Sequence, residues 1–206
     1  MKLYLVRHAE SISNKNGTVS NANSLLSKNG ISQAHLLGQK LLSQTNFAAI
    51  YSSPYARAKQ TAEIIASYDK RLDVIETDLI IEKKDASFLE GETREKIPWD
   101  LIMKMRVKPD WRHKDGESFN DVKKRVIAVF TEMKKYQEDA NILMISHNSF
   151  IKHLTAYVLL GDKFIPEFFY PIADRLGTRN GGVTILEQKQ KYYETKPSWY
   201  LASWMR

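Results

Sequence analysis

Short apolar runs separated by polar segments predict a sheet of buried strands. The runs KLYLV at residues 2–6 and NILMI at residues 141–145 are rich in aliphatic side chains and too short for core helices. Polar residues follow each run, as at a strand that stops at the edge of a sheet. The expected strands span residues 2–6, 48–51, 72–75 and 141–145, and residues 181–188 and 192–196 are expected to form a closing hairpin.

Between these runs, apolar residues recur at helical spacing. Ser27 and Ser118 are N-cap candidates, and Asp121, three residues after Ser118, resembles the second member of a capping box. Residues 11–26 are polar and predict a loop. The expected helices span about 28–42, 55–67, 98–106, 119–133 and 149–160. Because strands alternate with helices, we expect an α/β fold: a three-layer sandwich with a mostly parallel central sheet flanked by helices.

The stretch from about residue 83 to residue 116 has a less regular pattern. It contains two tryptophans and two prolines, and only its central part, around residues 98–106, has helical spacing. We interpret it as an insertion over the sheet, within a single domain that spans residues 1–206. A role as a lid over a site and a purely structural role both stay open.

Composition excludes several classes of chemistry. The 206 residues fit one domain, and the absence of cysteine excludes disulfides, thiolate catalysis and cysteine-bound metals. The apolar start of the chain ends at Arg7 and His8, and no apolar run approaches the roughly 18 residues of a membrane helix. We therefore expect a cytoplasmic protein with no membrane partner.

The charge of the chain favours anionic partners. Its formal net charge is +7 and its sequence pI is about 9.4, which suits phosphate esters, nucleic acid or a membrane surface. The lysine pairs at 83–84, 123–124 and 134–135 are scattered, so we interpret them as solvated surface. We interpret His35, His113 and His153 as structural.

Arginine and histidine gather where the predicted strands end. Arg7 and His8 follow the first strand, Arg57 comes shortly after the second, and His147 follows the strand at 141–145. In α/β sheets, ligands collect at the carboxyl ends of the strands. A single histidine at such a place is more often structural, so the indication of a site rests on the coincidence of all four residues.

These residue types suit a phosphate monoester, which is close to a dianion. Guanidinium groups bind phosphoryl oxygens in a fixed planar geometry. A neutral, oriented histidine can act as an in-line nucleophile, and a general acid is needed to protonate the departing alkoxide.

Several ordered motifs resemble those of the histidine phosphatase superfamily, the phosphoglycerate mutase-like enzymes. The segment LVRHAES at residues 5–11 resembles the family's strand followed by Arg-His-Gly-Glu-Ser/Thr, and SSPYARAKQTA at residues 52–62 resembles its second-arginine motif. The resemblance covers nearly the whole chain. Further matching positions are Asn14, residues 26–34, Gly116-Glu117-Ser118, Ser146-His147 and Asn180-Gly181.

The resemblance implies a role for each matching residue. His8 would attack phosphorus and form a phosphohistidine, while a backbone group would hold its other ring nitrogen. Water would then hydrolyse the phosphoenzyme, with no metal and no cofactor. The residues expected to bind the substrate are Arg7, Asn14, Arg57, His147 and Asn148.

The chain departs from the family pattern in three places. Ala9 and Asn148 each replace a glycine, and alanine disfavours a positive φ. The segment after Glu82, our candidate for the general acid, is one residue longer than the family's and lacks its glycine. Asp85 or Glu90 could act instead. Lys83 and Lys84, if close, would favour the ionised carboxylate over the acid.

Three functions compete. The first is a phosphatase for a small phosphate monoester, and the second is a phosphoglycerate mutase-type isomerase. The isomerase hypothesis is weakened because the chain lacks the Glu-Arg-His-Tyr-Gly segment of those mutases. The third is a non-catalytic module that binds phosphoanions, although such a module needs no nucleophile. We expect a small phosphorylated substrate, disfavour nucleic acid as a partner, and leave a homodimer open.

Overall fold

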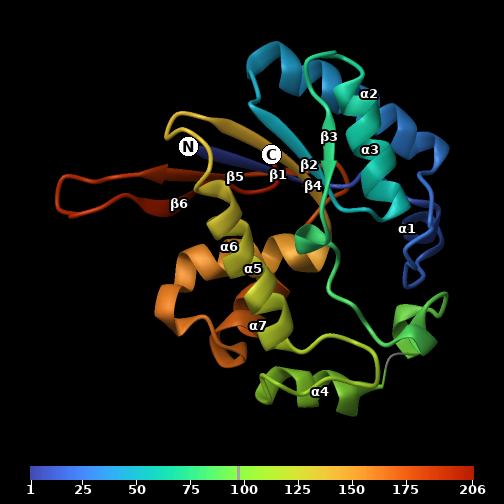
Figure 1. The fold of residues 1–206 in the computed structure, drawn as a ribbon. Helices are drawn as coiled ribbons and strands as arrows, with labels where there is room; N and C mark the ends of the chain where they lie inside the picture. The colour runs from blue at the N-terminus through green and yellow to red at the C-terminus, as the bar shows by residue number, and fades with distance from the viewer. Residues whose placement is uncertain (97) are drawn as a thin grey trace.

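A six-stranded sheet runs through the centre of the protein, as the computed structural model shows for residues 1–96 and 98–206 (Figure 1). The strand order is β3-β2-β4-β1-β5-β6. The strands are β1 (Lys2–Arg7), β2 (Ala49–Ser52), β3 (Val74–Glu76), β4 (Asn141–Ser146), β5 (Val183–Lys189) and β6 (Ser198–Ser203).

Strands β3, β2, β4 and β1 are parallel, and β5 and β6 add an antiparallel hairpin at one edge. The predicted mostly parallel sheet is therefore confirmed. In the register, Arg7 pairs with Ser146 and Ser52 pairs with Ile145. The carboxyl ends of β1, β2 and β4 thus lie side by side, and the residues that follow these strands meet.

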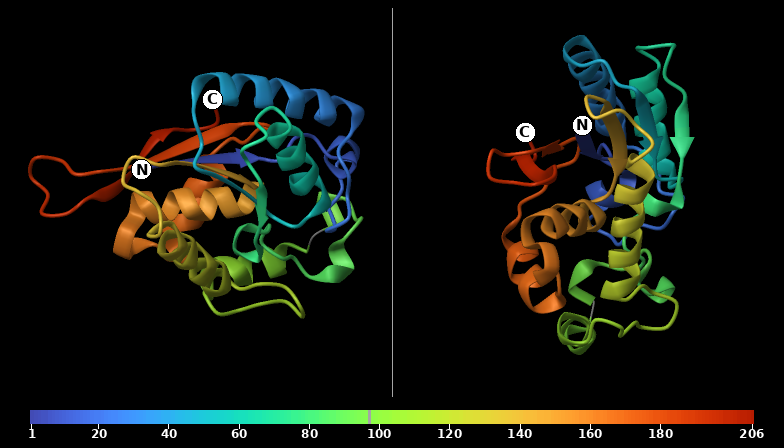
Figure 2. Two further views of the ribbon diagram at one scale, coloured as in Figure 1. Left: turned by 45° about the horizontal axis from the view of Figure 1, so that its top comes forward. Right: turned by 60° about the vertical axis from the view of Figure 1, so that its left-hand side comes forward.

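Helices cover both faces of the sheet, which gives the three layers expected (Figures 1 and 2). Helices α2 (Lys28–Gln44) and α3 (Ala56–Ala66) lie on one face, and α5 (Phe119–Met133) and α6 (Asn148–Leu160) lie on the other. The remaining helical elements are α1 (Ile12–Asn16), α4 (Trp99–Val107), α7 (Pro166–Arg175) and the short 3-10 helices η1 (Asp78–Ile80), η2 (Ser87–Leu89), η3 (Arg94–Lys96) and η4 (Gly161–Lys163).

The alternating faces of the strands divide the core in two. Leu3 and Leu5 of β1 pack with α5 and α6, whereas Tyr4 and Val6 pack with α2 and α3. Successive side chains of a strand point to opposite faces, so a parallel strand buried on both sides is apolar throughout. This explains why the uninterrupted run KLYLV forms a central strand.

Local signals fix where the helices begin. Ser27 accepts the N–H of Gly30 at 3.0 Å, and Ser118 and Asp121 form the expected capping box at the start of α5. Gly30 also allows a close approach, because a Cβ there would lie 2.0 Å from the carbonyl oxygen of Glu10. A side chain at this position would push α2 away from the loop that follows β1.

Two predicted segments differ from the structure. The predicted loop at 11–26 contains α1, because Ser11 and Asn14 form a capping box that the polar composition concealed. The second hairpin strand is Ser198–Ser203 and not residues 192–196. Tyr192 is fully exposed in the connecting turn, whereas Trp199 packs against the core. The later aromatic segment forms the strand because its side chains can be buried there.

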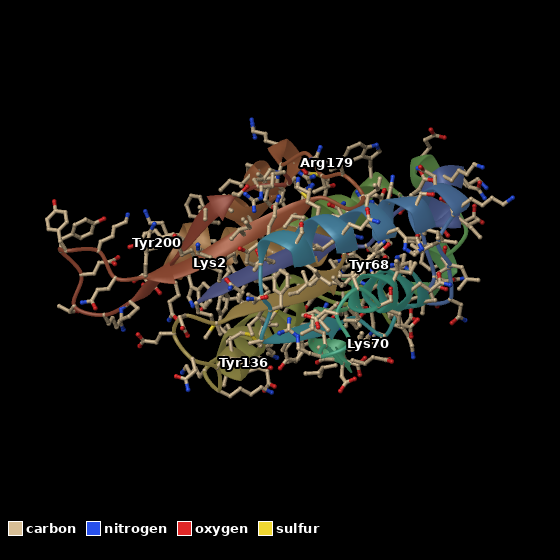
Figure 3. All side chains as sticks on the ribbon, turned by 90° about the horizontal axis from the view of Figure 1, so that it is seen from above. Lys2, Tyr68, Lys70, Tyr136, Arg179 and Tyr200 are labelled. Carbon is tan, nitrogen blue, oxygen red and sulfur yellow. The ribbon has the colours of Figure 1, made fainter. Side chains whose placement is uncertain are left out.

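Helix α7 had no counterpart in the prediction. Its interior contains Pro171, which removes a helical hydrogen-bond donor and weakens the sequence signal. Seen from above, the β5–β6 hairpin carries Tyr200 and extends beyond the helix-covered part of the sheet (Figure 3). No helix among the described residues is long and apolar enough to cross a membrane.

His153 of α6 lies in an aromatic cluster beside the main core. Its ring centroid is 4.0 Å from that of Phe169, and its Nδ1 lies 2.7 Å from the carbonyl oxygen of Ser149. Burial lowers the pKa of His153 to about 3, and the hydrogen bond to Ser149 only partly offsets this effect. The imidazole is therefore neutral in the folded protein near neutral pH.

This burial predicts a loss of stability in acid. In the unfolded chain His153 takes up a proton near pH 6.5, whereas in the folded protein it does so only near pH 3. The unfolded state binds more protons between these values, so stability present at pH 7 is lost as the pH falls. From pH 7 to pH 5, the free energy of unfolding should fall by about 2 kcal/mol more in the wild type than in His153→Leu.

Urea unfolding at both pH values measures this difference. His8 and His147 are present in both proteins, so their contributions cancel. An equal loss in wild type and variant would show that His153 is not held neutral by the fold.

Candidate active site

A cavity of about 330 Å³ opens at the carboxyl ends of the parallel strands. The predicted residues that line it are Arg7, His8, Asn14, Arg57, Glu82 and Asn148. His147 is fully buried beside them, with its ring centroid 5.1 Å from that of His8. The structure therefore brings all the predicted site residues together.

Hydrogen bonds at both ring nitrogens orient His8. Its Nδ1 lies 2.7 Å from the carbonyl oxygen of Ala9, and its Nε2 lies 3.0 Å from Nε of Arg57. A carbonyl only accepts and a guanidinium only donates, so the proton is on Nδ1 and Nε2 carries a lone pair. Burial, followed by the charge of Arg57, holds the pKa of His8 well below its usual value. The imidazole is therefore neutral and oriented.

Arg57 is placed by the first turn of α3 and is 2% exposed. Besides its contact with His8, it donates Nη1–H to the carbonyl oxygen of Asn21 at 2.8 Å, and its guanidinium lies 5.3 Å from the ring centroid of Tyr55. Burial lowers the pKa of Arg57, and Glu82 opposes this shift. An arginine stays protonated in proteins, so the site holds a fixed positive charge beside His8.

His147 is the N-cap residue of α6, directly after β4. Its Nε2 lies 2.8 Å from Oγ of Ser53, while its buried Nδ1 has no hydrogen-bond partner among the described residues. Burial, followed by the charge of Arg57, holds the pKa of His147 well below its usual value. The two adjacent histidines are thus both neutral.

Residues of the loop before β5 make hydrogen bonds to three residues of the site. Asn180 donates through Nδ2 to the carbonyl oxygen of His8 at 3.0 Å and to Oδ1 of Asn14 at 2.9 Å. Arg7 donates through Nη1 to Oγ1 of Thr178 at 3.3 Å. Asn14 and Arg7 are therefore positioned by residues that are far away in the sequence.

Replacement of the family glycine by Ala9 fits the observed backbone. Ala9 is not among the residues with positive φ, and its buried side chain packs with Leu26 and Ala34. Its N–H donates to Oγ1 of Thr61 at 3.1 Å. An alanine methyl is compatible with this ordinary conformation.

Glu82 is fixed by three backbone N–H groups. Its Oε1 accepts from Lys83 at 2.9 Å and Phe150 at 3.1 Å, and its Oε2 accepts from Ser149 at 3.2 Å. The carboxylate therefore caps the start of α6 while it lines the cavity. Asp85 and Glu90 line the same cavity, so position alone does not separate the three candidates for the general acid.

An ion pair holds the segment that leads to Glu82. Arg125 makes two hydrogen bonds of 2.8 Å to the carboxylate of Glu117. Its Nη1 also donates to the carbonyl oxygens of Leu79 and Ile81 at 3.0 Å. Because all three of its guanidinium nitrogens make hydrogen bonds, Arg125 holds the backbone just before Glu82 in place.

One expectation about the lysines is wrong. Lys83 is not part of a solvated surface pair: its side chain is only 8% exposed, lines the cavity and lies 3.4 Å from the carboxylate of Asp85. Asn148 lines the same cavity, and its Oδ1 is buried with no hydrogen-bond partner among the described residues.

Sequence reasoning assigned no role to Ser53, Tyr55 or Asn180. Ser53 contacts His147, Tyr55 lines the cavity between Arg57 and His147, and Asn180 holds the backbone of His8. All three lie in segments that match family motifs. Their presence in those motifs was the available signal, but their contacts depend on tertiary structure.

The arrangement can bind a dianion and present a neutral imidazole to it. Two guanidinium groups and two neutral histidines surround one end of the cavity. Within residues 1–96 and 98–206, no group of three or more histidine, aspartate or glutamate side chains is placed to hold a metal ion.

Comparison with known proteins supports one family. A sequence model of the histidine phosphatase superfamily (branch 1) matches residues 3–196. The chain is 36% identical over 151 residues to phosphoserine phosphatase 1 of Hydrogenobacter thermophilus, an alignment that covers 71% of each chain. It is 30% identical over 168 residues to the adenosylcobalamin/alpha-ribazole phosphatase of Escherichia coli, covering 77% of this chain and 79% of that one.

The solved structures include the same fold. A mycobacterial glucosyl-3-phosphoglycerate phosphatase superposes with a TM-score of 0.80 at 22% identity, and the match covers 98% of both chains. At this identity the likeness shows a shared three-layer fold.

The geometry of His8 predicts its protonation state. At pH 6, an imidazole with the ordinary pKa would be about three-quarters protonated. In the ligand-free protein, ¹⁵N NMR of labelled histidine should instead show His8 neutral at pH 6, with the proton on Nδ1. The spectrum of a His8→Asn variant assigns the signal. A His8 signal that titrates near pH 6.5 would contradict this arrangement.

Proposed function

The chain belongs to the histidine phosphatase superfamily and is a phosphoric monoester hydrolase, and we propose that it hydrolyses small phosphate monoesters through a phosphohistidine on Nε2 of His8. One observation carries the assignment of the nucleophile. His8 is neutral, its Nδ1 is anchored to a backbone carbonyl, and its Nε2 lone pair points to Arg57 at the end of the cavity. Relatives named as phosphoserine and alpha-ribazole phosphatases support a small phosphorylated molecule as the substrate.

The phosphoryl group binds where the positive charges converge. Nε of Arg57 now donates to the lone pair that must attack phosphorus. When the substrate enters, this hydrogen bond breaks and Arg57 donates to a phosphoryl oxygen instead. Arg7 and His147 bind further phosphoryl oxygens, and Asn14 and Asn148 line the same cavity. Fixed donors of this kind oppose the charge that builds in the transition state.

Transfer proceeds in two balanced steps. Nε2 of His8 forms a bond to phosphorus as the bond from phosphorus to the ester oxygen breaks, and Glu82 gives a proton to the departing alkoxide. Water then attacks the phosphohistidine, loses a proton to Glu82, and releases inorganic phosphate. Oε2 of Glu82 accepts only the N–H of Ser149 among the described contacts, which leaves a lone-pair position for the transferred proton.

The segment at residues 83–116 forms the outer wall of the cavity within one catalytic domain. It contributes Lys83, Asp85, Ser87, Glu90 and Asp115 to the lining. These residues lie beyond the phosphoryl end and face the alcohol part of the ester. We therefore assign this insertion to substrate selection.

The His8→Ala variant tests the function itself. With an aryl phosphate and a metal chelator present, the wild type should release phosphate and the variant should lose at least 99% of this activity, because the nucleophile is absent. Rapid alkaline or phenol quenching of the wild type with ³²P-labelled substrate should trap a phosphoenzyme that is stable in base and labile in acid.

His35→Ala is the matched control, since His35 lies on the surface and its only side-chain contact shown is with Tyr68. It should keep wild-type turnover. Equal activity in His8→Ala and the wild type, or a label carried on another residue, would exclude His8 as the nucleophile.

The dependence on leaving group tests Glu82. An alkoxide needs a proton far more than a nitrophenolate does, so Glu82→Gln should lower kcat about 100-fold or more for an alkyl phosphate. The loss for para-nitrophenyl phosphate should be much smaller, and formation of the phosphoenzyme from it should persist.

Asp85→Asn and Glu90→Gln serve as the comparison. If either variant shows the selective loss for alkyl esters and Glu82→Gln does not, that residue and not Glu82 is the general acid.

A further inference from the structure

Ser53 lies beside the second histidine of the site. It follows β2, its side chain is fully buried, and its Oγ lies 2.8 Å from Nε2 of His147. His147 is also fully buried, and its ring lies against the rings of His8 and Tyr55, which both line the cavity. The contact with Ser53 is the only hydrogen bond of this imidazole among the described residues. The hydroxyl of Ser53 therefore influences which ring nitrogen carries the proton.

The contacts of Ser53 decide the direction of this hydrogen bond. Within residues 1–96 and 98–206, its Oγ has one other partner, the backbone N–H of Tyr55, at 3.3 Å. A backbone N–H only donates, so it occupies a lone pair of the hydroxyl and leaves the hydroxyl proton available. The one acceptor that the described contacts offer to that proton is Nε2 of His147. Ser53 therefore donates to Nε2, which must carry a lone pair.

This direction fixes the tautomer of His147. The buried imidazole is neutral and holds a single proton, and a lone pair on Nε2 places that proton on Nδ1. Nδ1 is buried and has no hydrogen-bond partner in the part of the chain that the structure describes. A buried N–H without an acceptor is unfavourable. The ligand-free site therefore holds a donor that a bound anion would satisfy.

We propose that Ser53 is a positioning residue for phosphoryl transfer: its hydroxyl holds His147 in the tautomer whose Nδ1–H donates to a phosphoryl oxygen. The opposite tautomer would present the lone pair of Nδ1 to the same oxygen and repel it. The imidazole thus serves as a neutral donor beside the guanidinium of Arg57, and it takes up no proton when the substrate binds. The inference rests on the proposed function, because it requires His147 to bind a phosphoryl oxygen.

The two histidines of the site carry the same tautomer but present different atoms to the substrate. The carbonyl oxygen of Ala9 accepts the Nδ1–H of His8, which leaves the lone pair on Nε2 for attack. The hydroxyl of Ser53 donates to Nε2 of His147, which leaves Nδ1–H for donation. The fixed partner of each ring therefore determines whether that ring acts as a nucleophile or as a hydrogen-bond donor.

The tautomer of His147 can be measured in the wild-type protein. In ¹⁵N NMR of labelled histidine near neutral pH, the ligand-free protein should show the ring proton of His147 on Nδ1. The spectrum of a His147→Asn variant assigns the signal. Addition of inorganic phosphate should shift this Nδ1–H signal, because the group gains an acceptor. A proton on Nε2 in the ligand-free protein would overturn the proposal.

Removal of the hydroxyl tests its effect on phosphate binding. In Ser53→Ala the tautomer is no longer fixed, and only the fraction of molecules with Nδ1–H can donate to the ligand. The Kd for inorganic phosphate, measured by the same titration, should therefore rise about tenfold or more. The kcat/KM for para-nitrophenyl phosphate should fall by a similar factor.

Two variants serve as comparisons for Ser53→Ala. Ser53→Thr keeps the hydroxyl and should stay within about threefold of the wild type in both values. Thr184→Val is the matched control, because it removes another fully buried hydroxyl, one that has no hydrogen-bond partner among the described residues. It should leave both values unchanged. Thermal unfolding shows whether Ser53→Thr still folds, and the tautomer of the wild type decides if it does not.

A double-mutant cycle shows whether Ser53 acts through His147. In His147→Asn, the side-chain amide can place an N–H near the position of Nδ1, and no tautomer remains to be fixed. Ser53→Ala should therefore change the Kd for phosphate by less than about threefold in the His147→Asn background. An equal loss in both backgrounds, or the same loss in Thr184→Val, would overturn the proposal, because the effect would not depend on the imidazole.

The outcomes separate this inference from the proposed function. If turnover depends on His8 but His147 carries its proton on Nε2, the role of Ser53 is wrong and the phosphatase function stands. The same conclusion follows if Ser53→Ala binds phosphate and turns over the substrate as the wild type does. If inorganic phosphate shifts no histidine signal and para-nitrophenyl phosphate is inert, the proposed function itself fails.

Discussion

The in-register parallel pairing of β1 with β4 is the constraint on which the site depends. Because Arg7 pairs with Ser146, His8 and His147 are the next residues on neighbouring strands, and their rings lie side by side. The N–H of His8 also donates to the carbonyl oxygen of Ser146 at 2.9 Å, which extends the pairing to the proposed nucleophile. A slip by one residue would shift the histidines by about 3.3 Å and move Leu3 and Leu5 to the opposite face of the sheet. Packing of the core against α5 and α6 therefore protects the geometry of the catalytic end.

That geometry concentrates positive charge in a buried place, and the neutral state of both histidines limits the electrostatic cost. Two protonated imidazoles beside Arg7 and Arg57 would add unfavourable charge to a buried part of the site. Burial and the arginines instead hold the pKa of His8 and of His147 below the ordinary value, so the site contains guanidinium charges and neutral rings. The lowered pKa of these histidines has two effects. It limits the electrostatic destabilisation of the empty site, and it leaves a lone pair on Nε2 of His8 for attack. The arriving dianion then supplies the missing negative charge.

The sequence predicted those parts of the molecule that depend on local signals. Apolar runs located the parallel strands, and serine caps located α2 and α5, because both signals are contained in a few neighbouring residues. Family motifs predicted that His8, Arg57 and His147 share one site, and in the structure their side chains lie next to each other. What local patterns could not show was the partner of each side chain. The bond from Asn180 to His8, the contact of Ser53 with His147 and the inward turn of Lys83 all join residues that are brought together only by folding. The hairpin was misplaced for the same reason, since Tyr192–Tyr193 and Trp199–Tyr200 are both aromatic and only burial against the core distinguishes them.

Two kinds of segment meet at the cavity: residues that follow the strands of the core, and residues of the segment at 83–116. His8 and His147 follow strands whose positions are set by the core, and Arg57 lies in the first turn of α3, whereas Lys83 and Asp85 belong to the segment at 83–116. Glu82 lies at the junction of these two regions. Its segment is one residue longer than the family pattern, yet its carboxylate is tied to the start of α6 and the backbone before it is clamped by Arg125 and Glu117. The carboxylate of Glu82 therefore keeps its place at the start of α6, and the next residue, Lys83, lines the cavity. Under the proposed mechanism, a change of length beyond Glu82 can alter the outer lining of the cavity while the carboxylate that donates the proton stays in place.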